Sequence, residues 1–221
     1  MTCPQCCGIE RFFDDKAARR ELRRYRRKGP SKTTAMLVGA LARQRAQGAR
    51  GASFIDVGGG VGAVQHELMA AGASSGTSVD ASPAYLEAAR TEAATRGYAD
   101  RMRYFGGDVV EVQRQLDPAD LVALDRVICC YPDMPAIVDA TARLAKSVYG
   151  LVYPRDTRLA RLMIAALNLV QRVRRDPFRA FVHRTADVEA RVESHGLRKA
   201  ERATTLIWQV VVFARAHDGT A

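Results

Sequence analysis

The sequence lacks any apolar run of membrane-spanning length, which would take about twenty consecutive apolar residues. Its start also lacks the apolar core of a secretory signal, so we expect the chain to stay in the cytoplasm. No internal repeat or low-complexity tract interrupts it. The 221 residues, 48% hydrophobic and 26% charged, therefore predict a globular protein with one domain and a small appendage.

Cysteine is scarce and odd in number, with Cys3, Cys6 and Cys7 near the start and the pair Cys129 and Cys130 further on. In the cytoplasm we expect these thiols to be mostly reduced. No second Cys-x-x-Cys and no pair of histidines completes a zinc site of the usual spacing. We therefore expect no resident metal ion.

Acidic residues are scarce only in the first part of the chain. Residues 1–50 hold thirteen Lys and Arg against four acidic residues, whereas residues 51–221 hold twenty-one against twenty. The pattern of residues 1–50 predicts two helices, one over residues 10–28 and a second that Ser31 caps. Their arginines could attract an anionic substrate, an acidic membrane surface or nucleic acid, or they could form a solvated helix face.

The clearest functional signal is the stretch Ser53-Phe54-Ile55-Asp56-Val57-Gly58-Gly59-Gly60-Val61-Gly62. It predicts a strand, a tight turn and the start of a helix near Ala63. Gly58, Gly60 and Gly62 can adopt positive φ or let a ligand approach bare backbone. The free amides at the start of the helix point back at the loop. Together these features predict a pocket for a nucleotide-like ligand.

Two later strands are also expected to end in acids. Residues 77–80 predict a strand that ends at Asp80, about twenty residues after the loop, where a doubly wound sheet places a ribose-binding carboxylate. Residues 102–105 predict a third strand, which Asp108 follows. Asp56, Asp80 and Asp108 should then rim one edge of the sheet.

The order of Asp-x-Gly-x-Gly-x-Gly, an acid after the second strand and an acid after the third resembles the class I S-adenosylmethionine-dependent methyltransferases. Dinucleotide-binding oxidoreductases use Gly-x-Gly-x-x-Gly instead. The resemblance implies S-adenosyl-L-methionine as cofactor and an α/β fold with a doubly wound, seven-stranded, mostly parallel Rossmann-like sheet. It also implies that the first acid and the glycines face the methionine part, the second acid the ribose and the third the adenine. The expected cofactor-binding residues are Asp56, Gly58, Gly59, Gly60, Gly62, Asp80, Ala81, Asp108, Val109 and Cys130.

Strand and helix patterns alternate through the rest of the chain at the spacing of βαβ units, which predicts helices on both faces of the sheet. The fourth strand is expected within residues 121–130, with 126–130 favoured. The remaining strands are expected at residues 148–153, 197–201 and 207–215, the last two as an antiparallel hairpin.

Residues 1–50 are predicted to form a helical cap or lid, and residues 51–221 the cofactor-binding domain with an insertion at 155–183. Within the insertion, residues 157–175 carry an apolar stripe flanked by arginines. A cover packed on the core is the favoured explanation, and a face for peripheral membrane contact is the alternative.

Three short elements stand out in the second half of the chain. They are Cys130-Tyr131-Pro132, the stretch Phe-Val-His-Arg-Thr-Ala-Asp-Val-Glu at 181–189, and Thr204-Thr205 ahead of Phe213-Ala214-Arg215. These elements resemble the magnesium-protoporphyrin O-methyltransferases. That family has a histidine, implicated in catalysis, directly before its Tyr-Pro, whereas this chain has Cys130 there. The resemblance implies a small-molecule methyltransferase and leaves the porphyrin substrate open.

Transfer of a sulfonium methyl group is an in-line displacement, so the enzyme mainly holds a nucleophile about 3 Å from the methyl carbon and excludes water. The candidates for substrate contact or catalysis are Cys130, Tyr131, His183 and Tyr25, with Asp133 close by. Tyr131 could equally be a pocket wall, and a structural hydrogen bond is the favoured role for His183. We expect O-methylation of an anionic or aromatic small molecule.

Two other functions stay open. The two cysteine clusters could together bind a thiophilic metal or metalloid, as cysteines do in the arsenite methyltransferases. The function would then be thiol-assisted methylation of a metalloid or thiol substrate. The other function is an arginine-rich, nucleic-acid-associated protein. It would need a basic groove with aromatics for stacking, whereas the one tryptophan, Trp208, falls in the last predicted strand. Nucleic acid is therefore a disfavoured partner.

Overall fold

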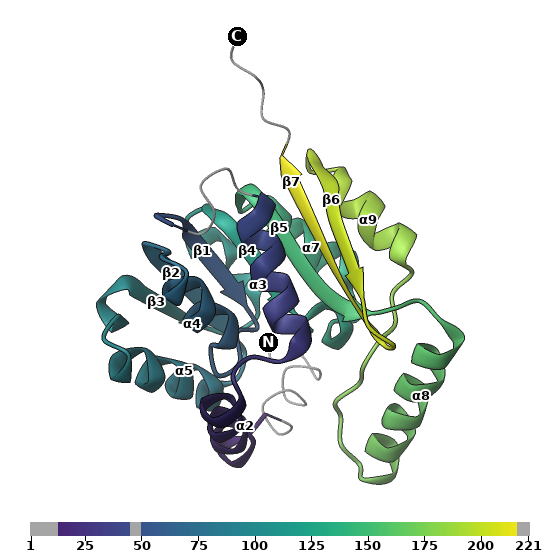
Figure 1. The fold of residues 1–221 in the computed structure, drawn as a ribbon. Coiled ribbons are helices and arrows are strands. Elements are labelled where there is room, and N and C mark those ends of the chain that lie inside the picture. Colours follow the sequence, from purple (N-terminus) through teal and green to yellow (C-terminus); the bar gives the residue numbers. More distant parts are fainter. Residues whose placement is uncertain (1–12, 45–49, 216–221) are drawn as a thin grey trace.

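A seven-stranded sheet forms the centre of the molecule, in the order β3-β2-β1-β4-β5-β7-β6 (Figure 1). The structure is a computed structural model that describes residues 13–44 and 50–215. All strands run parallel except β7, which pairs antiparallel with both β5 and β6. The predicted doubly wound, mostly parallel sheet is confirmed. The strands are β1 (Ser53–Val57), β2 (Ser75–Asp80), β3 (Met102–Gly106), β4 (Ala119–Asp125), β5 (Ala145–Pro154), β6 (Leu197–Thr204) and β7 (Trp208–Arg215).

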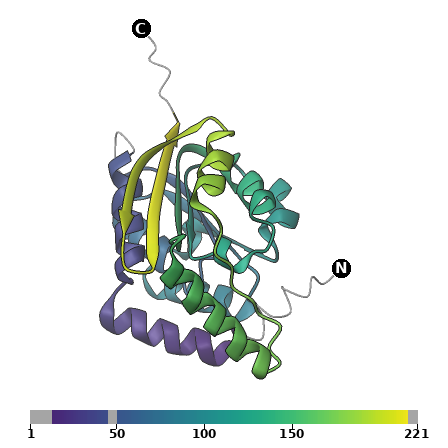
Figure 2. The same ribbon diagram turned by 90° about the vertical axis from the view of Figure 1, so that its right-hand side faces the viewer.

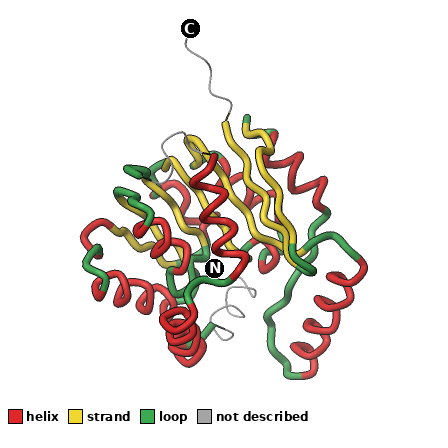
Figure 3. Tube along the Cα trace, in the orientation of Figure 1, coloured by secondary structure: helices red, strands yellow, loops and turns green. Residues whose placement is uncertain are grey.

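Helices cover both faces of the sheet (Figure 3). The side chains of α3, α4 and α5 pack with Phe54 and Leu121 on one face, and those of α6, α7 and α9 pack with Ile55 and Val122 on the other. Because successive side chains of a strand point to opposite faces, neighbours in β1 and in β4 belong to different cores. The helices are α2 (Asp15–Lys28), α3 (Lys32–Gln44), α4 (Ala63–Ala70), α5 (Pro83–Thr95), α6 (Val109–Val112), α7 (Met134–Ala142), α8 (Arg158–Val173) and α9 (Thr185–Glu193), with short 3-10 helices η1 (Ala99–Arg101), η2 (Gln113–Gln115) and η3 (Ile128–Cys130).

The two N-terminal helices have different places in the fold. In α3, Leu37 and Leu41 are fully buried against the sheet. Gly150 of β5 leaves room for them, because a Cβ there would lie 2.6 Å from a methyl carbon of Leu37 and 2.9 Å from one of Leu41. Helix α2 instead lies beyond the ends of the parallel strands and packs against α5 (Figure 1). The division of the chain at residue 50 stays a prediction.

The fourth strand overlaps the predicted range 121–130, but its favoured position at 126–130 is wrong. β4 ends at Asp125, and the residues expected in the strand form a bend at Arg126 followed by η3. Arg126 has φ of 63°, in the left-handed region that non-glycine residues rarely adopt, which turns the chain out of the sheet. At the other end of β4, the Asp120 carboxylate accepts hydrogen bonds from the amide and hydroxyl of Ser53 at 2.8 and 2.9 Å. Cys130 ends η3 and so lies beyond the sheet rather than in a strand.

The last part of the chain adds α8, α9 and the predicted β6–β7 hairpin. Helix α8 occupies the predicted insertion between β5 and α9, and only Ala160 and Gln171 among its residues are buried. It extends beyond the sheet at the end where the parallel strands finish (Figure 2). None of the helices in the described part of the chain is long and apolar enough to span a bilayer.

Candidate active site

A cavity of about 540 Å³ lies at the carboxyl ends of the parallel strands. The segments that follow β1, β2, β3 and β4 form its walls, and α2, α8 and β7 contribute from the sides. Open α/β sheets bind ligands at this edge, where the strand order reverses. Here the order reverses between β1 and β4.

The glycine loop after β1 forms the floor of the cavity. Gly58, Gly60 and Gly62 have φ of 60°, 57° and 83°, as the sequence predicts. A Cβ on Gly58 would lie 2.6 Å from a methyl carbon of Val127, and one on Gly59 would lie 2.8 Å from Oδ2 of Asp56. Gly58, Gly59 and Gly60 line the cavity, whereas Gly62 is the N-cap of α4 and is not among the lining residues.

Asp56 is fully buried beneath this loop and lines the cavity. Its Oδ2 accepts a hydrogen bond of 3.3 Å from the amide of Gln65, whereas Oδ1 has no partner in the described part of the chain. Burial raises the pKa of Asp56 well above its usual range, and the charges of Asp125 and Asp80 add to this effect. A buried oxygen without a partner is costly, so a cationic ligand group here would be stabilised.

Asp80 ends β2 and holds the glycine loop in place. Its Oδ2 accepts a hydrogen bond of 2.9 Å from the amide of Gly60, and its Oδ1 accepts one of 2.8 Å from the amide of Ser82. Burial raises the pKa of Asp80, while these two amides act in the opposite direction. Asp80 and the adjacent Ala81 line the cavity. Each carboxylate oxygen can accept a further hydrogen bond, so Asp80 can also bind ligand hydroxyls.

Asp108 lies on the cavity wall after β3 and caps α6. Its Oδ1 accepts a hydrogen bond of 2.9 Å from the amide of Val110, and its Oδ2 accepts one of 2.8 Å from the hydroxyl of Tyr131. Val109 and Tyr131 line the cavity beside it. Tyr131 therefore joins the turn after β4 to the third predicted acid.

Asp125 and Arg126, neither of which was predicted from the sequence, also line the cavity. Arg126 Nε donates a hydrogen bond of 3.1 Å to Oδ1 of Asp125, and the hydroxyl of Thr34 in α3 donates to Oδ2. The guanidinium carbon of Arg126 lies 6.0 Å from the ring centre of Trp208 in β7, within cation–π range. Asp125 is a fourth acid at the end of a parallel strand, but the strand favoured at 126–130 put it before the strand, so the sequence reasoning missed it.

His183 is not among the residues that line the cavity, whereas Cys130, Tyr131 and Asp133 are. His183 Nε2 lies 2.8 Å from the carbonyl oxygen of Ile128 and 3.1 Å from that of Tyr131. Because both partners can only accept, Nε2 carries the proton and donates. His183 therefore holds η3 and the cavity residues that follow it, which is the structural role favoured from the sequence.

Tyr25 is not among the cavity residues either. It is buried between α2 and the core helices, where its hydroxyl donates a hydrogen bond of 2.8 Å to Glu67 and its ring lies beside His66. Burial, together with Glu67, raises the pKa of the Tyr25 hydroxyl above its ordinary value. The Tyr25 hydroxyl thus points at α4 and away from the cavity, and its contact with a substrate stays a prediction.

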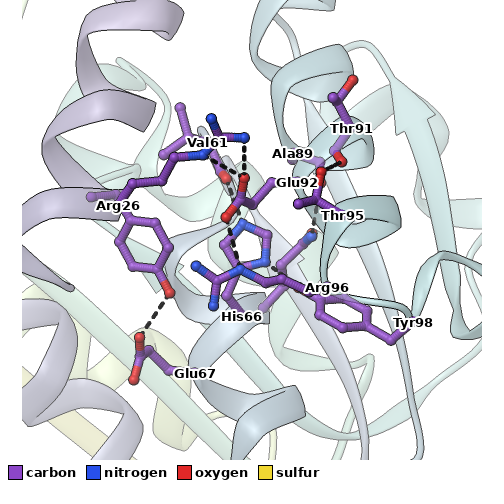
Figure 4. Close-up of polar contacts among 12 residues, drawn as sticks. Arg26, Val61, His66, Glu67, Ala89, Thr91, Glu92, Thr95, Arg96 and Tyr98 are labelled. Atoms are coloured by element: carbon purple, nitrogen blue, oxygen red, sulfur yellow. Dashed lines mark hydrogen bonds and ion pairs between the residues drawn. The ribbon is translucent and has the colours of Figure 1, made fainter.

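A polar cluster around the buried Glu92 and His66 lies behind the glycine loop (Figure 4). Glu92 of α5 pairs with Arg26 of α2 at 2.6 Å and with Arg96 at 2.9 Å. His66 Nε2 donates a hydrogen bond of 2.9 Å to the carbonyl oxygen of Val61 in the loop. Burial lowers the pKa of His66 to about 4, so this histidine is neutral at physiological pH. The cluster ties α2, α4 and α5 to the loop.

The first turns of α2 and the residue before it, Phe13, cover one side of the cavity. The ring of Phe13 makes edge-to-face contacts with Tyr85 at 5.5 Å and with Phe178 at 5.8 Å between ring centres. Ser82 Oγ donates a hydrogen bond of 2.7 Å to the carbonyl oxygen of Phe13, and the Tyr85 hydroxyl donates one of 2.9 Å to Glu21. Phe13 and Glu21 both line the cavity and were missed from the sequence.

The two adjacent cysteines place their sulfur atoms 3.9 Å apart. The thiol of Cys130, together with burial, raises the pKa of Cys129 well above its ordinary value, so Cys129 stays protonated. Thiolates rather than thiols ligate metals. Across residues 13–44 and 50–215, no three His, Cys, Asp or Glu side chains are placed to hold a metal ion. The first predicted cysteine cluster, Cys3, Cys6 and Cys7, lies outside the described residues.

Residues 54–148 match the family model described as a methyltransferase domain. No curated protein matches the chain significantly. Among solved structures, magnesium protoporphyrin IX methyltransferase from Synechocystis PCC 6803 with bound SAH is 20% identical with a TM-score of 0.68, over 84% of this chain and 83% of that one. An O-methyltransferase family protein from Burkholderia thailandensis is 18% identical with a TM-score of 0.70, over 94% of this chain and 62% of that one. The pyocyanin biosynthetic protein PhzM is 19% identical with a TM-score of 0.58, over 83% of this chain and 55% of that one.

Proposed function

The chain is a class I, S-adenosylmethionine-dependent methyltransferase, and we propose that it methylates an oxygen of a small molecule that combines an anionic group with an apolar body. The observation that carries this proposal is the guanidinium of Arg126, which the left-handed bend after β4 places on the cavity wall.

The cavity residues fit the cofactor S-adenosylmethionine. The unpartnered Oδ1 of Asp56 suits the ammonium group of the methionine part. Gly58 and Gly59 offer bare backbone where any side chain would collide with Val127 or Asp56. Asp80 is placed to accept hydrogen bonds from ribose hydroxyls, and Asp108 to accept one from the adenine amino group. The bound cofactor supplies an electrophilic methyl group on a positively charged sulfur.

Arg126 is the one cationic side chain among the described residues that line the cavity. The other charged lining residues are the acids Glu21, Asp56, Asp80, Asp108, Asp125 and Asp133. Acids suit a positively charged cofactor, whereas they repel an anionic acceptor. An anionic acceptor would therefore bind at Arg126, whose planar guanidinium matches the geometry of a carboxylate.

Apolar side chains line the part of the cavity that faces α7 and α8. They include Ile137, Ile164 and Leu167, with Trp208 next to Arg126. An acceptor with an aromatic or aliphatic body would fit this wall while its anionic group meets Arg126. Excluding water from this space favours attack on the methyl group by the acceptor rather than by water.

The proposed methyl transfer to a carboxylate does not require a general base. A carboxylate acceptor is ionised at neutral pH, so it needs only to be held in line and desolvated. The hydroxyl of Tyr131 is already engaged by Asp108, and the structural hydrogen bonds of His183 keep its imidazole in place. These contacts support a role for both side chains in positioning the cavity wall.

The similar structures support a small-molecule acceptor. One of them is a magnesium protoporphyrin IX methyltransferase, and another is a pyocyanin biosynthetic protein.

We further propose that residues 1–50 act as a cap on the cofactor domain 51–221, with residues 155–183 as its insertion. Phe13 and Glu21 support this role because they cover the cavity from the N-terminal side.

The test is to screen aromatic and aliphatic carboxylic acids, phenols and thiols for methyl transfer, and then to measure Arg126→Gln with the best acceptor. We expect the KM for an anionic acceptor to rise by roughly tenfold or more, because a charged hydrogen bond is worth about 1.5–3 kcal/mol. Cofactor affinity, measured by calorimetry, should stay within about threefold of the unsubstituted protein.

The matched control is Arg114→Gln, which removes an exposed arginine outside the cavity. A loss of cofactor affinity with an unchanged acceptor KM would assign Arg126 to the cofactor and overturn the proposal. Preferential methylation of thiols or arsenite, abolished by Cys130→Ser, would instead favour the thiol-assisted function.

A further inference from the structure

Helix α8 carries an apolar face that the rest of the described chain leaves uncovered. The exposed stripe consists of Leu159, Leu162, Met163, Leu169, Val170 and Val173. Leu162, Leu169 and Val173 expose 69%, 61% and 76% of their surface. Contiguous exposed apolar surface of this kind marks an interaction site.

The exposed stripe is distinct from the face of α8 that closes the cavity. Ala160, Ile164, Leu167 and Gln171 recur at helical spacing on the inner side, and Ile164 and Leu167 line the cavity. At 3.6 residues per turn, the exposed stripe occupies a separate sector about 120° wide. Packing onto the described core therefore accounts for the inner side only and leaves the exposed stripe available for a partner.

Charge narrows the identity of that partner. Residues 157–175 contain Arg158, Arg161, Arg172, Arg174 and Arg175 and no acidic residue. Arg161 pairs with Asp156 just before the helix. An aliphatic stripe bordered by arginines is typical of a helix that lies in the headgroup region of a bilayer. The stripe contains no aromatic ring on which a nucleic-acid base could stack.

Helix α2 adds positive charge at the same end of the molecule, as two views at right angles show (Figures 1 and 2). Besides Arg26, which pairs with Glu92, its exposed basic residues are Lys16, Arg19, Arg20, Arg23, Arg24, Arg27 and Lys28. This charge would attract anionic headgroups, each nearby basic residue contributing on the order of a fewfold to tenfold in binding. It also disfavours a second copy of the chain as the occupant, because two basic faces repel each other.

We propose that this end of the molecule binds the surface of an anionic lipid bilayer, with the exposed stripe of α8 among the headgroups and the arginines of α2 and α8 against them. Glu21 of α2 and Ile164 and Leu167 of α8 line the cavity at this same end. The binding needs neither cofactor nor acceptor, so it holds or fails independently of the proposed reaction.

The test is co-sedimentation of the full chain with vesicles of phosphatidylcholine alone and of phosphatidylcholine mixed with phosphatidylglycerol. We expect binding to the mixed vesicles, at least about tenfold weaker binding to the neutral ones, and loss of binding as salt is added. Equal binding to both vesicles, or no binding to either, would overturn the proposal.

Substitutions to glutamine separate the apolar contribution to vesicle binding from the electrostatic one. Leu162→Gln with Leu169→Gln should weaken binding to mixed vesicles by roughly tenfold or more without changing charge. Arg158→Gln with Arg172→Gln should weaken it by about tenfold and reduce the salt dependence. The control is Lys146→Gln, an exposed charge at the start of β5 and thus at the opposite end of the strands, which should bind as the unsubstituted chain does.

All these positions are exposed, so thermal melting should be unchanged in each variant. Vesicle binding that the α8 variants leave intact would contradict the assignment of this face. A dimer in vesicle-free solution that Leu162→Gln dissociates would show that a second copy covers the stripe, and the proposal would be wrong.

Discussion

The carboxylate of Asp80 accepts a hydrogen bond of 2.9 Å from the backbone amide of Gly60, which joins the end of β2 to the loop after β1. The sequence places these residues twenty positions apart, and the parallel pairing of β1 with β2 brings them together. One side chain thus shapes the glycine loop and remains available to ligand hydroxyls.

Asp80→Ala should weaken binding of S-adenosylmethionine by about tenfold or more, since a hydrogen bond to a charged acceptor is worth roughly 1.5–3 kcal/mol. Titration calorimetry measures this directly. Asp117→Ala is the control, because that side chain is 83% exposed and lies outside the cavity. Unchanged affinity in Asp80→Ala would remove this residue from the cofactor site.

Asp56→Asn should have opposite effects on stability and on binding. Oδ1 of Asp56 is buried without a partner in the described part of the chain, and the charges of Asp125 and Asp80 disfavour its ionised form. Removing the charge of Asp56 should therefore raise the free energy of unfolding of the cofactor-free protein by about 1 kcal/mol or more. The same change should weaken cofactor binding, because the ammonium group loses its counter-charge. Denaturant unfolding and calorimetry give the two values.

The pH dependence of cofactor binding provides a second check on Asp56. Burial raises the pKa of Asp56 well above its usual range, so protonation neutralises it at a higher pH than an ordinary carboxylate. Affinity for the cofactor should therefore fall as the pH is lowered through this raised pKa. The Asp56→Asn variant should lack this part of the dependence, and an identical pH profile in both proteins would contradict the assignment.

Gly58→Ala should destabilise the protein for two separable reasons. The φ of 60° at Gly58 costs any other residue roughly 1–2 kcal/mol, and the new Cβ would lie 2.6 Å from a methyl carbon of Val127. Adding Val127→Ala should recover the part of the lost unfolding free energy that the collision causes. The part caused by the backbone conformation should remain. A double-mutant cycle from urea unfolding measures this coupling, and strictly additive effects would show that the two side chains do not collide.

His66 should make the folded state sensitive to acid. Burial lowers the pKa of His66 to about 4 from an ordinary 6.5, so the unfolded chain binds a proton that the folded chain does not. The contribution of neutral His66 to the free energy of unfolding is fully present above pH 6.5 and is lost as the pH falls towards 4. It amounts to roughly 3 kcal/mol. The His66→Gln variant should show a flatter stability profile over this window. Parallel profiles would mean that His66 titrates normally.

The fold and the cofactor side of the cavity could be predicted because their signals are local. Positive φ at Gly58 and Gly60 and the acids after β2 and β3 follow from short sequence patterns. The fourth strand was misplaced because residues 119–130 contain two apolar runs separated by Asp125 and Arg126. Local pattern does not distinguish such runs, whereas pairing with β1 and the left-handed bend at Arg126 select the first.

The acceptor side depends on contacts between residues far apart in the chain. The pattern of α2 predicts a helix, but it does not say that Tyr25 meets Glu67 in α4 while Glu21 meets Tyr85 in α5. The neighbourhood of Arg126 and Trp208 likewise requires β7 to lie beside β5. These partners are set by tertiary packing, which no single stretch encodes.

The close fit of α3 over Gly150 has a consequence for how ligands enter. Because α3 packs so closely on the central strands, we expect it to stay in place when a ligand enters. A movement that lets a ligand pass Phe13 and Glu21 should then rotate α2 about Gly29, where the φ of 70° already departs from helical geometry. We expect backbone amides of α3 to exchange slowly with deuterium and those of α2 faster, with added ligand slowing only the latter. Equal protection of both helices would place the entrance elsewhere.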